Sequence, residues 1–446
     1  MTGVGARHAP RSEAHWQRTR SRSQSRGKGT SHAPTLTRGT YVESAVTIWP
    51  IARKVTSVNN VPQIKDIDAA MLTGLVRQAL GSSTAEIRHW EHHPVSYINT
   101  EESSLGLHRF TGAAQDQGEV RPWSLVLKAV HAPVNDTNPT CWNYHRREIL
   151  AYQQGLLADL PDGLLAPRCF GISEHPEGVC WLWLEDLSDG ASQSWSLAEY
   201  GLAARHLGRF NGAYGAGHPL PSLPWLSHHW LRGWLSEYQA SSRVVLDLVR
   251  DERFWEHPLL RSAFPRSVTD DVLRLWARHD ALLATLDQLP RTFCHLDAYR
   301  PNLFVRRGAQ GAKETVAIDW VFAGIGAIGE EIANLLAASL IWFEYDAAEA
   351  RRLDEAVFDG YLDGLREVGW QGEGRLVRLG YTAACALRWG VVGLWWMRSL
   401  SDAGKQAELE KQWSRSMPEL VSQWAKTTSY VLSLAQEAHQ LQCALF

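Results

Sequence analysis

The chain has 446 residues, of which 45% are hydrophobic and 21% charged, and its formal net charge is −3. These values exclude a chain too polar to fold and predict a globular protein that can bury a substantial core. Its six cysteines form no CxxC pair and no zinc-like spacing, which indicates reduced, mostly buried thiols.

Residues 1–60 differ in composition from the rest of the chain. They contain ten Lys and Arg residues against Glu13 and Glu43, a formal +8, which leaves −11 for residues 61–446. The Arg- and Ser-rich stretch 18–26 predicts a disordered leader, or a reading frame that begins too early, so that residues 1–40 are no genuine part of the protein. A transit peptide or a nucleic-acid-binding arm is the alternative, although we expect no nucleic-acid partner.

Residues 123–130 have the pattern of a strand that carries a lysine. Apolar residues on both sides of Lys128 predict burial on both faces, and a buried amine requires an anionic partner. Residues 142 to about 160 have helical spacing, and Glu148 lies on the inward stripe, four residues before Tyr152. We therefore predict an ion pair between Lys128 and Glu148, with a surface lysine and a marginal glutamate as the alternative.

Helix patterns dominate the chain from about residue 197 onward. Ser196 and Glu199 form a capping box at the start of the first helix. The most apolar stretch, residues 382–397, is interrupted by Arg388 and is too short for a transmembrane helix, so we expect a core helix and no membrane contact. Comparable helical spacing occurs in residues 348–369, 376–400 and 418–440.

A hairpin is predicted where residues 303–305 and 315–318 form two apolar, β-branched runs around a polar stretch with two glycines. Asn302 enters the first strand and Asp319 leaves the second, so both lie at the end away from the loop. Directly opposite residues there have Cβ atoms about 5 Å apart. Two oxygen ligands in this position can share one Mg²⁺ ion.

Asp297 reaches the same neighbourhood through the apolar lead-in of residues 292–294. It precedes Asn302 by five positions, which is the spacing of a kinase catalytic loop. The sequence therefore predicts a proton-accepting carboxylate beside a metal pair.

These motifs resemble the aminoglycoside phosphotransferase and choline kinase group of small-molecule kinases. Residues 294–302, CHLDAYRPN, match the His-x-Asp-x4-Asn loop of that group, residues 318–320 match its Ile-Asp-Trp, and Glu331-Ile332-Ala333 stands where it has Asp-Leu-Ala. The resemblance implies an α+β, two-lobed protein-kinase-like fold. We expect a small strand-rich N-lobe over residues 61–187 and a larger, mostly helical C-lobe over residues 188–446.

The resemblance also implies a phosphate-binding loop before the lysine strand. The polar stretch of residues 99–106 is correctly placed, and Ser103, Ser104 and Gly106 are the candidates, together with Lys128. The stretch contains neither GxGxxG nor a Walker-type loop, and an ordinary hairpin turn fits it equally well.

The apolar run of residues 181–184 ends in Glu185, Asp186 and Leu187, and it resembles the hinge of the group. Adenine would bind there mostly through backbone groups. The choice between ATP and GTP stays open.

Four further roles follow from the resemblance. Asp297 would accept the proton of a substrate hydroxyl, and Glu331 would brace the loop that carries it. His295 would tie this loop to the core through its imidazole, with a role as a base as the alternative. Arg300 would form an ion pair within the loop, or alternatively contact the γ-phosphate.

The acceptor would lie between the catalytic loop and the C-terminal helices, where Glu330, Trp342, Glu344 and Tyr345 are the wall candidates. Acidic groups suit an aminocyclitol and aromatics with carboxylates suit a choline-like cation, so an antibiotic, a cationic metabolite and a sugar all stay open. Most other tryptophans are expected in the core, namely Trp225, Trp230, Trp234, Trp389, Trp395 and Trp396.

The resulting hypothesis is a cytoplasmic, ATP- and Mg²⁺-dependent kinase that phosphorylates a hydroxyl of a small molecule. A catalytically silent nucleotide-binding protein is the alternative. A protein kinase is less favoured, because neither Asp-Phe-Gly nor Ala-Pro-Glu follows Asp319. The sequence leaves open the acceptor, the oligomeric state, and a role in antibiotic resistance or in metabolism.

Overall fold

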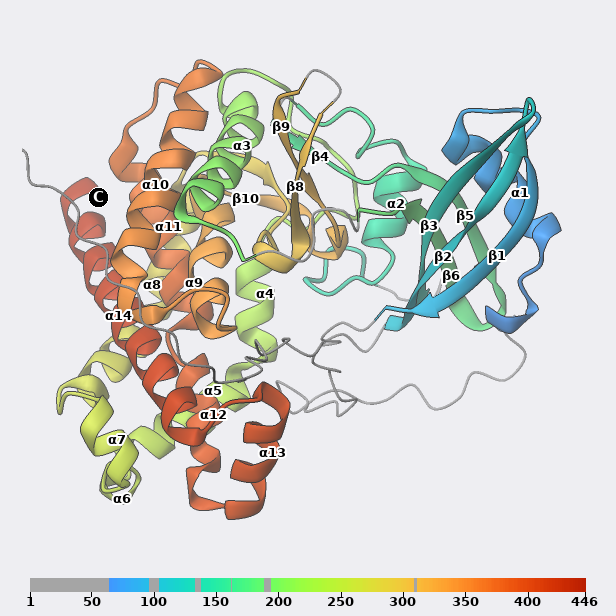
Figure 1. Ribbon diagram of the computed structural model, residues 1–446. Coiled ribbons are helices and arrows are strands. Elements are labelled where there is room, and N and C mark those ends of the chain that lie inside the picture. The colour runs from blue at the N-terminus through green and yellow to red at the C-terminus, as the bar shows by residue number, and fades with distance from the viewer. Residues whose placement is uncertain (1–63, 96–103, 133–137, 162, 188–193, 309–310) are drawn as a thin grey trace, which may run out of the picture. The chain divides into compact units, whose positions relative to one another are not determined.

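The computed structural model describes residues 64–95, 104–132, 138–161, 163–187, 194–308 and 311–446 (Figure 1). These residues all belong to one unit of the chain, Val42–Phe446. The predicted leader and Ser103 lie outside the described residues.

A five-stranded antiparallel sheet with the strand order β1-β2-β3-β6-β5 forms the N-terminal part (Figure 1). Its strands are β1 (Glu86–Pro94), β2 (Ser104–Asp116), β3 (Glu119–His131), β5 (Cys169–His175) and β6 (Val179–Glu185). Helix α1 (Ala69–Leu80) covers one face, where Leu125 and Leu127 of β3 are buried against it. The opposite face carries Ser124, Val126 and Lys128, which are only half-buried. The face that carries the lysine is thus less deeply buried than predicted, although Val130 on the same face is buried.

Helix α2 (Arg147–Gln153) is much shorter than the segment of residues 142–160 that the apolar spacing predicted. The fully buried Arg147 donates hydrogen bonds to the carbonyls of Cys141 and Trp142, which holds the preceding residues in turns. Gly155, with a φ of 74°, ends the helical region on the other side. Tertiary bonding and one glycine thus override the periodicity.

Two small sheets lie outside the five-stranded sheet. In the first, β7 (Arg291–Cys294) pairs with β10 (Gly324–Ala327). In the second, the predicted hairpin is present as β8 (Leu303–Arg307) and β9 (Lys313–Ala317), and the short β4 (Leu164–Leu165) runs parallel to β9. Leu303 lies opposite Ala317, so Asn302 and Asp319 leave the hairpin at the same end, as predicted.

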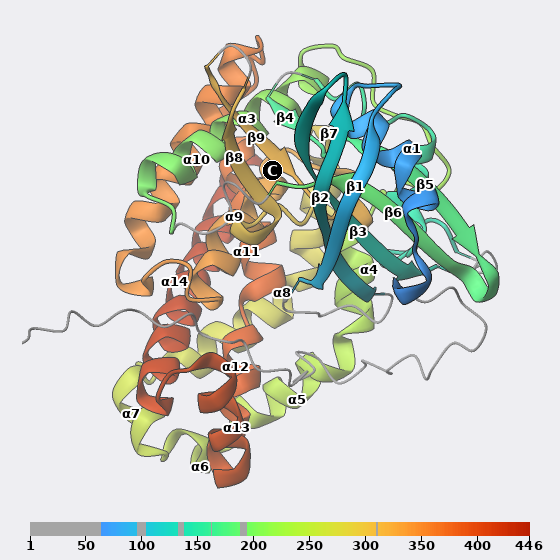
Figure 2. The ribbon, with the colours of Figure 1, turned by 45° about the vertical axis from the view of Figure 1, so that its right-hand side comes forward.

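Helices make up most of the remaining chain (Figures 1 and 2). The capping box at Ser196 and Glu199 starts α3, as predicted. The predicted helix of residues 376–400 is two helices, α11 and α12, with Gly390 and Val391 between them. The helices are α3 (Leu197–Gly215), α4 (Trp230–Glu237), α5 (Gln239–Arg250), α6 (Glu252–Trp255), α7 (Pro258–Ala263), α8 (Val268–Gln288), α9 (Ala333–Ile341), α10 (Ala350–Glu367), α11 (Gly374–Trp389), α12 (Val392–Met397), α13 (Ala403–Trp413) and α14 (Met417–Leu445).

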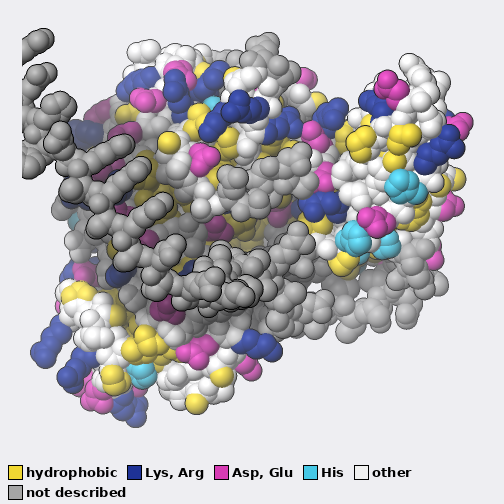
Figure 3. Space-filling view, viewed as in Figure 1, with side chains coloured by type: hydrophobic (Ala, Val, Ile, Leu, Met, Phe, Trp, Pro, Cys, Tyr) yellow, Lys and Arg dark blue, Asp and Glu magenta, His cyan; other side chains and the backbone are white. Residues whose placement is uncertain are grey.

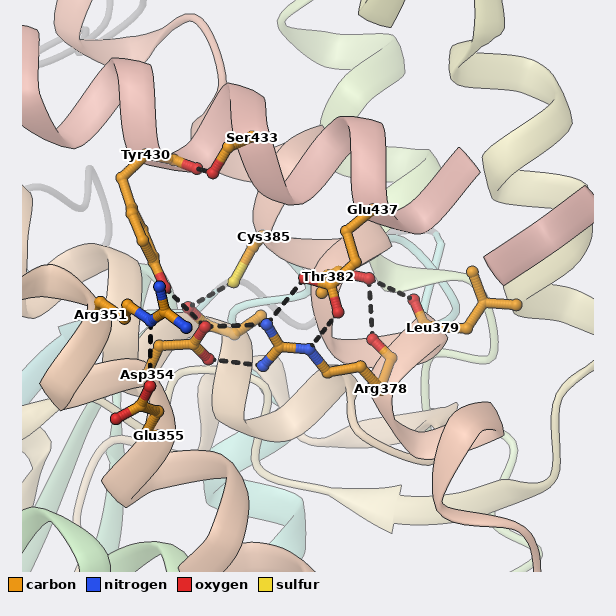
Figure 4. A network of polar contacts seen from close by, with 11 residues as sticks. Arg351, Asp354, Glu355, Arg378, Leu379, Thr382, Cys385, Tyr430, Ser433 and Glu437 are labelled. Carbon is orange, nitrogen blue, oxygen red and sulfur yellow. Dashed lines mark hydrogen bonds and ion pairs between the residues drawn. The ribbon is translucent and has the colours of Figure 1, made fainter. Parts of the chain in front are cut away.

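A partly buried ionic network fixes three of these helices to one another (Figure 4). Arg378 of α11 donates to both carboxylate oxygens of Asp354 on α10, at 2.6 and 2.8 Å, and to those of Glu437 on α14, at 2.7 and 2.8 Å. The Tyr430 hydroxyl adds a 2.6 Å bond to Asp354. Although burial lowers the pKa of Arg378, its bonds to these carboxylates raise it overall, so the guanidinium stays charged.

Most of the tryptophans expected in the core are buried there; Trp234 is half-buried. All six cysteines are free thiols, and three of them are buried. Within the described ranges, every helix is too short or too polar to cross a membrane. On the face drawn in Figure 3, the basic and acidic side chains of the described residues are interspersed.

Candidate active site

The loop that follows β7 is held by hydrogen bonds to the buried Glu331. Glu331 accepts hydrogen bonds from the backbone N–H groups of His295, at 2.7 Å, and Leu296, at 3.1 Å. Leu296 has a φ of 64°, a strained value for a branched side chain, and these two bonds hold it. Burial raises the pKa of the Glu331 carboxyl to about 7. The longer side chain of Glu therefore makes the bracing contacts expected of the Asp in the family motif.

His295 joins this loop to the segment that carries Asp319. Its Nδ1 accepts from the backbone N–H of Asp297 at 3.1 Å, so Nε2 carries the proton and donates to the Ile318 carbonyl at 2.8 Å. Complete burial lowers the pKa of the imidazole to about 4, so the ring is neutral. The predicted structural tie is present.

The Asp297 carboxylate is held on both oxygens. Oδ1 accepts from Asn334 Nδ2 and from the Arg388 guanidinium, each at 2.9 Å, and Oδ2 accepts from Asn302 Nδ2 at 2.9 Å. Burial raises the pKa of Asp297, and the charge of Arg388 opposes this. The side chain is thus fixed in orientation beside Asn302.

Asn302 and Asp319 have the chemistry of a hard-cation pair. The Asn302 amide nitrogen donates hydrogen bonds to Asp297, and the amide oxygen is the atom that could bind a cation. Asp319 has a φ of 65° and a ψ of 66°, and its Oδ1 contacts Lys128 at 2.8 Å. One amide oxygen and one carboxylate suit Mg²⁺, which binds proteins through few oxygen ligands and keeps several waters or phosphate oxygens.

Lys128 connects the sheet to this pair. Its Nζ lies 2.6 Å from Glu148 Oε2 as well as 2.8 Å from Asp319 Oδ1. Glu148 Oε1 accepts from the Trp320 backbone N–H at 3.3 Å. The glutamate thus contacts both Lys128 of β3 and the residue after Asp319. Burial raises the pKa of Glu148, against the effect of Lys128. The predicted ion pair is confirmed.

The candidate phosphate-loop residues lie farther into the sheet than expected. Ser104 and Gly106 belong to β2, opposite Val130 and Ala129 of β3, with a register shift between them. Gly106 has a φ of 148°, which favours glycine. The two residues are thus near Lys128, but in a strand rather than in the predicted loop.

At the predicted hinge, the carboxylates point into ion pairs. Glu185 pairs with Arg306 of β8 at 2.8 Å, which joins the end of β6 to the hairpin. Asp186 pairs with Arg109 of β2 at 2.9 Å. Leu187 follows as the last described residue of this segment.

The predicted acceptor residues separate into two groups. Glu344 lies 4.0 Å from Arg300 Nε, and Tyr345 packs edge-on against Tyr200. Arg300 thus pairs with the turn that follows α9, and its guanidinium lies over Trp195, 5.7 Å from the ring centroid.

The side chains of Trp342 and Glu330 have other partners. Trp342 packs against Trp396 and Trp413 in an aromatic cluster, with ring centroids 5.5 and 5.4 Å away. The Glu330 carboxylate turns back to the Ala327 backbone N–H at 2.8 Å. Glu344 therefore lies beside Arg300 of the loop that carries Asp297.

Sequence reasoning missed Arg388 and Asn334 as partners of Asp297. The signal for Arg388 was present, since a charge inside the most apolar stretch of the chain requires a buried partner. Its guanidinium also packs over Trp230, 4.5 Å from the ring centroid. Asn334 gave a weaker signal, as a lone amide among the apolar residues of α9.

The chain belongs to the phosphotransferase enzyme family, whose model matches residues 116–371. The protein is therefore a small-molecule kinase with a protein-kinase-like fold, and the predictions of fold class and of ATP-dependent transfer to a hydroxyl group are confirmed. Among curated proteins, no sequence matches the chain.

Several solved structures are similar. An aminoglycoside phosphotransferase from Alicyclobacillus acidocaldarius is 13% identical, with a TM-score of 0.44 and coverage of 78% of this chain and 92% of that one. An amicoumacin kinase solved with AMP-PNP, Ca²⁺ and its substrate is 14% identical, with a TM-score of 0.41 and coverage of 74% and 89%. A microcompartment-associated aminopropanol kinase is 14% identical, with a TM-score of 0.40 and coverage of 82% and 98%. The family assignment rests on the family match alone.

Proposed function

We infer that Asp297, Lys128, Glu148, Asn302 and Asp319 form the centre that transfers the γ-phosphoryl group of ATP to a hydroxyl of a small molecule. One observation carries this proposal: Lys128 contacts Glu148 and Asp319 at the same time, at 2.6 and 2.8 Å. Residues far apart in the chain thereby bring together a lysine, a metal-type carboxylate and, through Asn302, the Asp297 carboxylate.

Each residue has one task in this proposal. Asp297 orients the acceptor hydroxyl and takes its proton. Glu148 holds the Lys128 amine at the site, where it can pair with phosphate oxygens. Asn302 and Asp319 would hold Mg²⁺, which supplies charge neutralisation at the triphosphate when it is bound. Most of the rate acceleration would come from positioning and from fixed charge.

The acceptor class is proposed from the residues beside the loop. Glu344 and Tyr345 offer a carboxylate and an aromatic ring, which suit an amino-alcohol, an aminoglycoside-like molecule or a sugar. Arg300 binds Glu344 and would set its orientation. A cytoplasmic location is part of the same proposal.

The first experiment is phosphate transfer from ATP, and in parallel from GTP, across aminoglycosides, choline-like amines, amino-alcohols and sugars. We expect transfer to at least one hydroxyl compound, and Asp297→Asn should lower kcat by about two to four orders of magnitude, as for loss of a general base. Magnesium titration of Asp319→Asn should show a weaker metal dependence. Retained activity in Asp297→Asn would remove the catalytic assignment, and nucleotide binding without transfer to any acceptor would favour the silent alternative.

A further inference from the structure

One face of the sheet carries a second charged cluster at some distance from Lys128. Side chains that alternate along a strand share a face, so Ser124, Val126 and Lys128 of β3 point the same way. Arg109 of β2 lies opposite Val126 and shares that face. Ser124 is four residues from Lys128, which is about 13 Å along an extended strand.

Asp186, just past the end of β6, completes the cluster. Its side chain is only 5% exposed, and its Oδ2 accepts from Arg109 Nε at 2.9 Å and from the Ser124 hydroxyl. Three elements of the sheet thus meet in one ionic contact. A carboxylate buried to this extent anchors the guanidinium through its Nε edge.

The contact with Asp186 uses one edge of the Arg109 guanidinium. The Arg109 side chain as a whole is 37% exposed, and it lies on the same face as two apolar side chains, Val126 and Leu184, which are paired across β3 and β6. A planar, weakly hydrated cation beside apolar side chains is suited to stack on an aromatic ring.

We propose that Arg109, held by Asp186 and Ser124, forms the nucleobase subsite, with its guanidinium stacked on the purine ring. This rests on the proposed function, which puts the triphosphate at Lys128. A nucleotide with its phosphates there would extend along β3 toward Val126 and Arg109. The base then lies against Val126 and the guanidinium, while the backbone of residues 185–187 lies at its edge.

Stacking contacts the face of a nucleobase and makes no hydrogen bond to the groups at its edge. Arg109 therefore contributes to ATP and GTP binding alike, and any preference between them arises at the hinge backbone. Arg121 offers a matched control: it pairs with Asp116 at 2.6 Å with exposures of 38% and 6%, close to those of the Arg109 pair. It lies seven residues before Lys128 and so on the other face of β3.

The test compares the affinity of the full-length protein for ATP and for inorganic tripolyphosphate, which has no base, by calorimetry with magnesium present. Arg109→Met should raise the Kd for ATP and GTP about tenfold, in the range of a desolvated cation–π contact, and leave that for tripolyphosphate unchanged. Arg121→Met should change neither affinity. Lys128→Met should weaken both ligands, since it acts on the phosphates.

The outcomes distinguish a failure of the nucleobase subsite from a failure of the proposed phosphotransfer function. Unchanged ATP affinity in Arg109→Met, or an equal loss for ATP and tripolyphosphate, overturns the nucleobase subsite while the proposed function stands. Failure of the unmodified protein to bind ATP overturns both. If the Met variant does not fold, Arg109→Lys keeps the charge but removes the planar face, and it should show the same selective loss for nucleotides.

Discussion

At the scale of single residues, Asp297 shows how a carboxylate is kept ready inside the protein. Its ionised form is disfavoured by burial, and the Arg388 guanidinium at 2.9 Å and two amides compensate for the lost water. Arg388 also donates to the Leu296 carbonyl at 2.8 Å, so it fixes both the charge and the backbone of the loop.

Arg388 should therefore affect turnover more than nucleotide affinity. We predict that Arg388→Met lowers kcat about tenfold to a hundredfold, the equivalent of a lost hydrogen bond to a charged group, with a small change in KM for ATP. Added guanidinium ion should restore part of the rate. Arg398→Met is the control, since Arg398 packs over Trp395 and has no contact with Asp297. An unchanged kcat in a folded Arg388→Met protein would contradict the prediction.

Glu331 gives a pH-dependent contribution to stability with a defined sign. Burial raises the pKa of its carboxyl from 4.5 to about 7 in the folded protein. Between these values the folded state keeps a proton that the unfolded chain has lost, so this group lowers the free energy of unfolding as pH rises through the window. The full effect is on the order of 3 kcal/mol.

Glu331→Gln removes this titration but keeps one acceptor for the loop. Relative to the unmodified protein, the variant should gain stability as pH is raised from 5 to 8, measured by urea unfolding. His295, whose pKa burial lowers to about 4, is present in both proteins, so its own contribution cancels in the difference. Parallel stability curves over this range would show that Glu331 does not titrate as stated.

At the scale of elements, α3 and α10 pack closely because glycines line their contact. A Cβ atom at Gly364 would lie 2.0 Å from the Arg205 carbonyl oxygen, and one at Gly208 would lie 2.1 Å from that of Tyr361. Both obstacles are backbone atoms, which cannot move aside as a flexible side chain can. This packing supports α3, whose Asn211 reaches the Phe293 carbonyl in β7 at 2.8 Å.

Gly364→Ala should force these helices apart. We predict a loss of about 1–3 kcal/mol in the free energy of unfolding, since the strain exceeds the better helix propensity of alanine. Gly74→Ala in α1 is the matched control, because a Cβ there meets nothing within 4 Å and should stabilise the protein slightly. Equal stabilities of the two variants in thermal or urea unfolding would contradict the packing argument.

At the scale of the whole molecule, the parts of the site that lie close in sequence could be predicted from it. The spacing of Asp297 and Asn302 and the hairpin that carries Asp319 follow from local pattern, and the Lys128–Glu148 pair follows from the cost of burying a charge. Partners from distant elements could not be predicted. Arg388 lies 91 positions from Asp297, and no local periodicity encodes that meeting.

The predicted boundaries of α2 were wrong for a related reason. Long-range bonds of Arg147 to the carbonyls of Trp225 and Val321 decide where α2 begins, at 3.0 and 2.7 Å, and its own apolar stripe does not. The same limit applies to Arg300, whose ion pair with Glu344 depends on the fold rather than on the loop. The boundary between the lobes near residue 187, like the individual roles of the site residues, stays a prediction.

The neighbouring residues Arg147 and Glu148 have a joint consequence for control of the enzyme. They point in different directions from α2, one into backbone carbonyls around Val321 and the other into Lys128. The helix is thereby clamped in the position that the lysine pair requires. We therefore expect α2 to keep this position when nucleotide and acceptor bind, rather than to move as a switch.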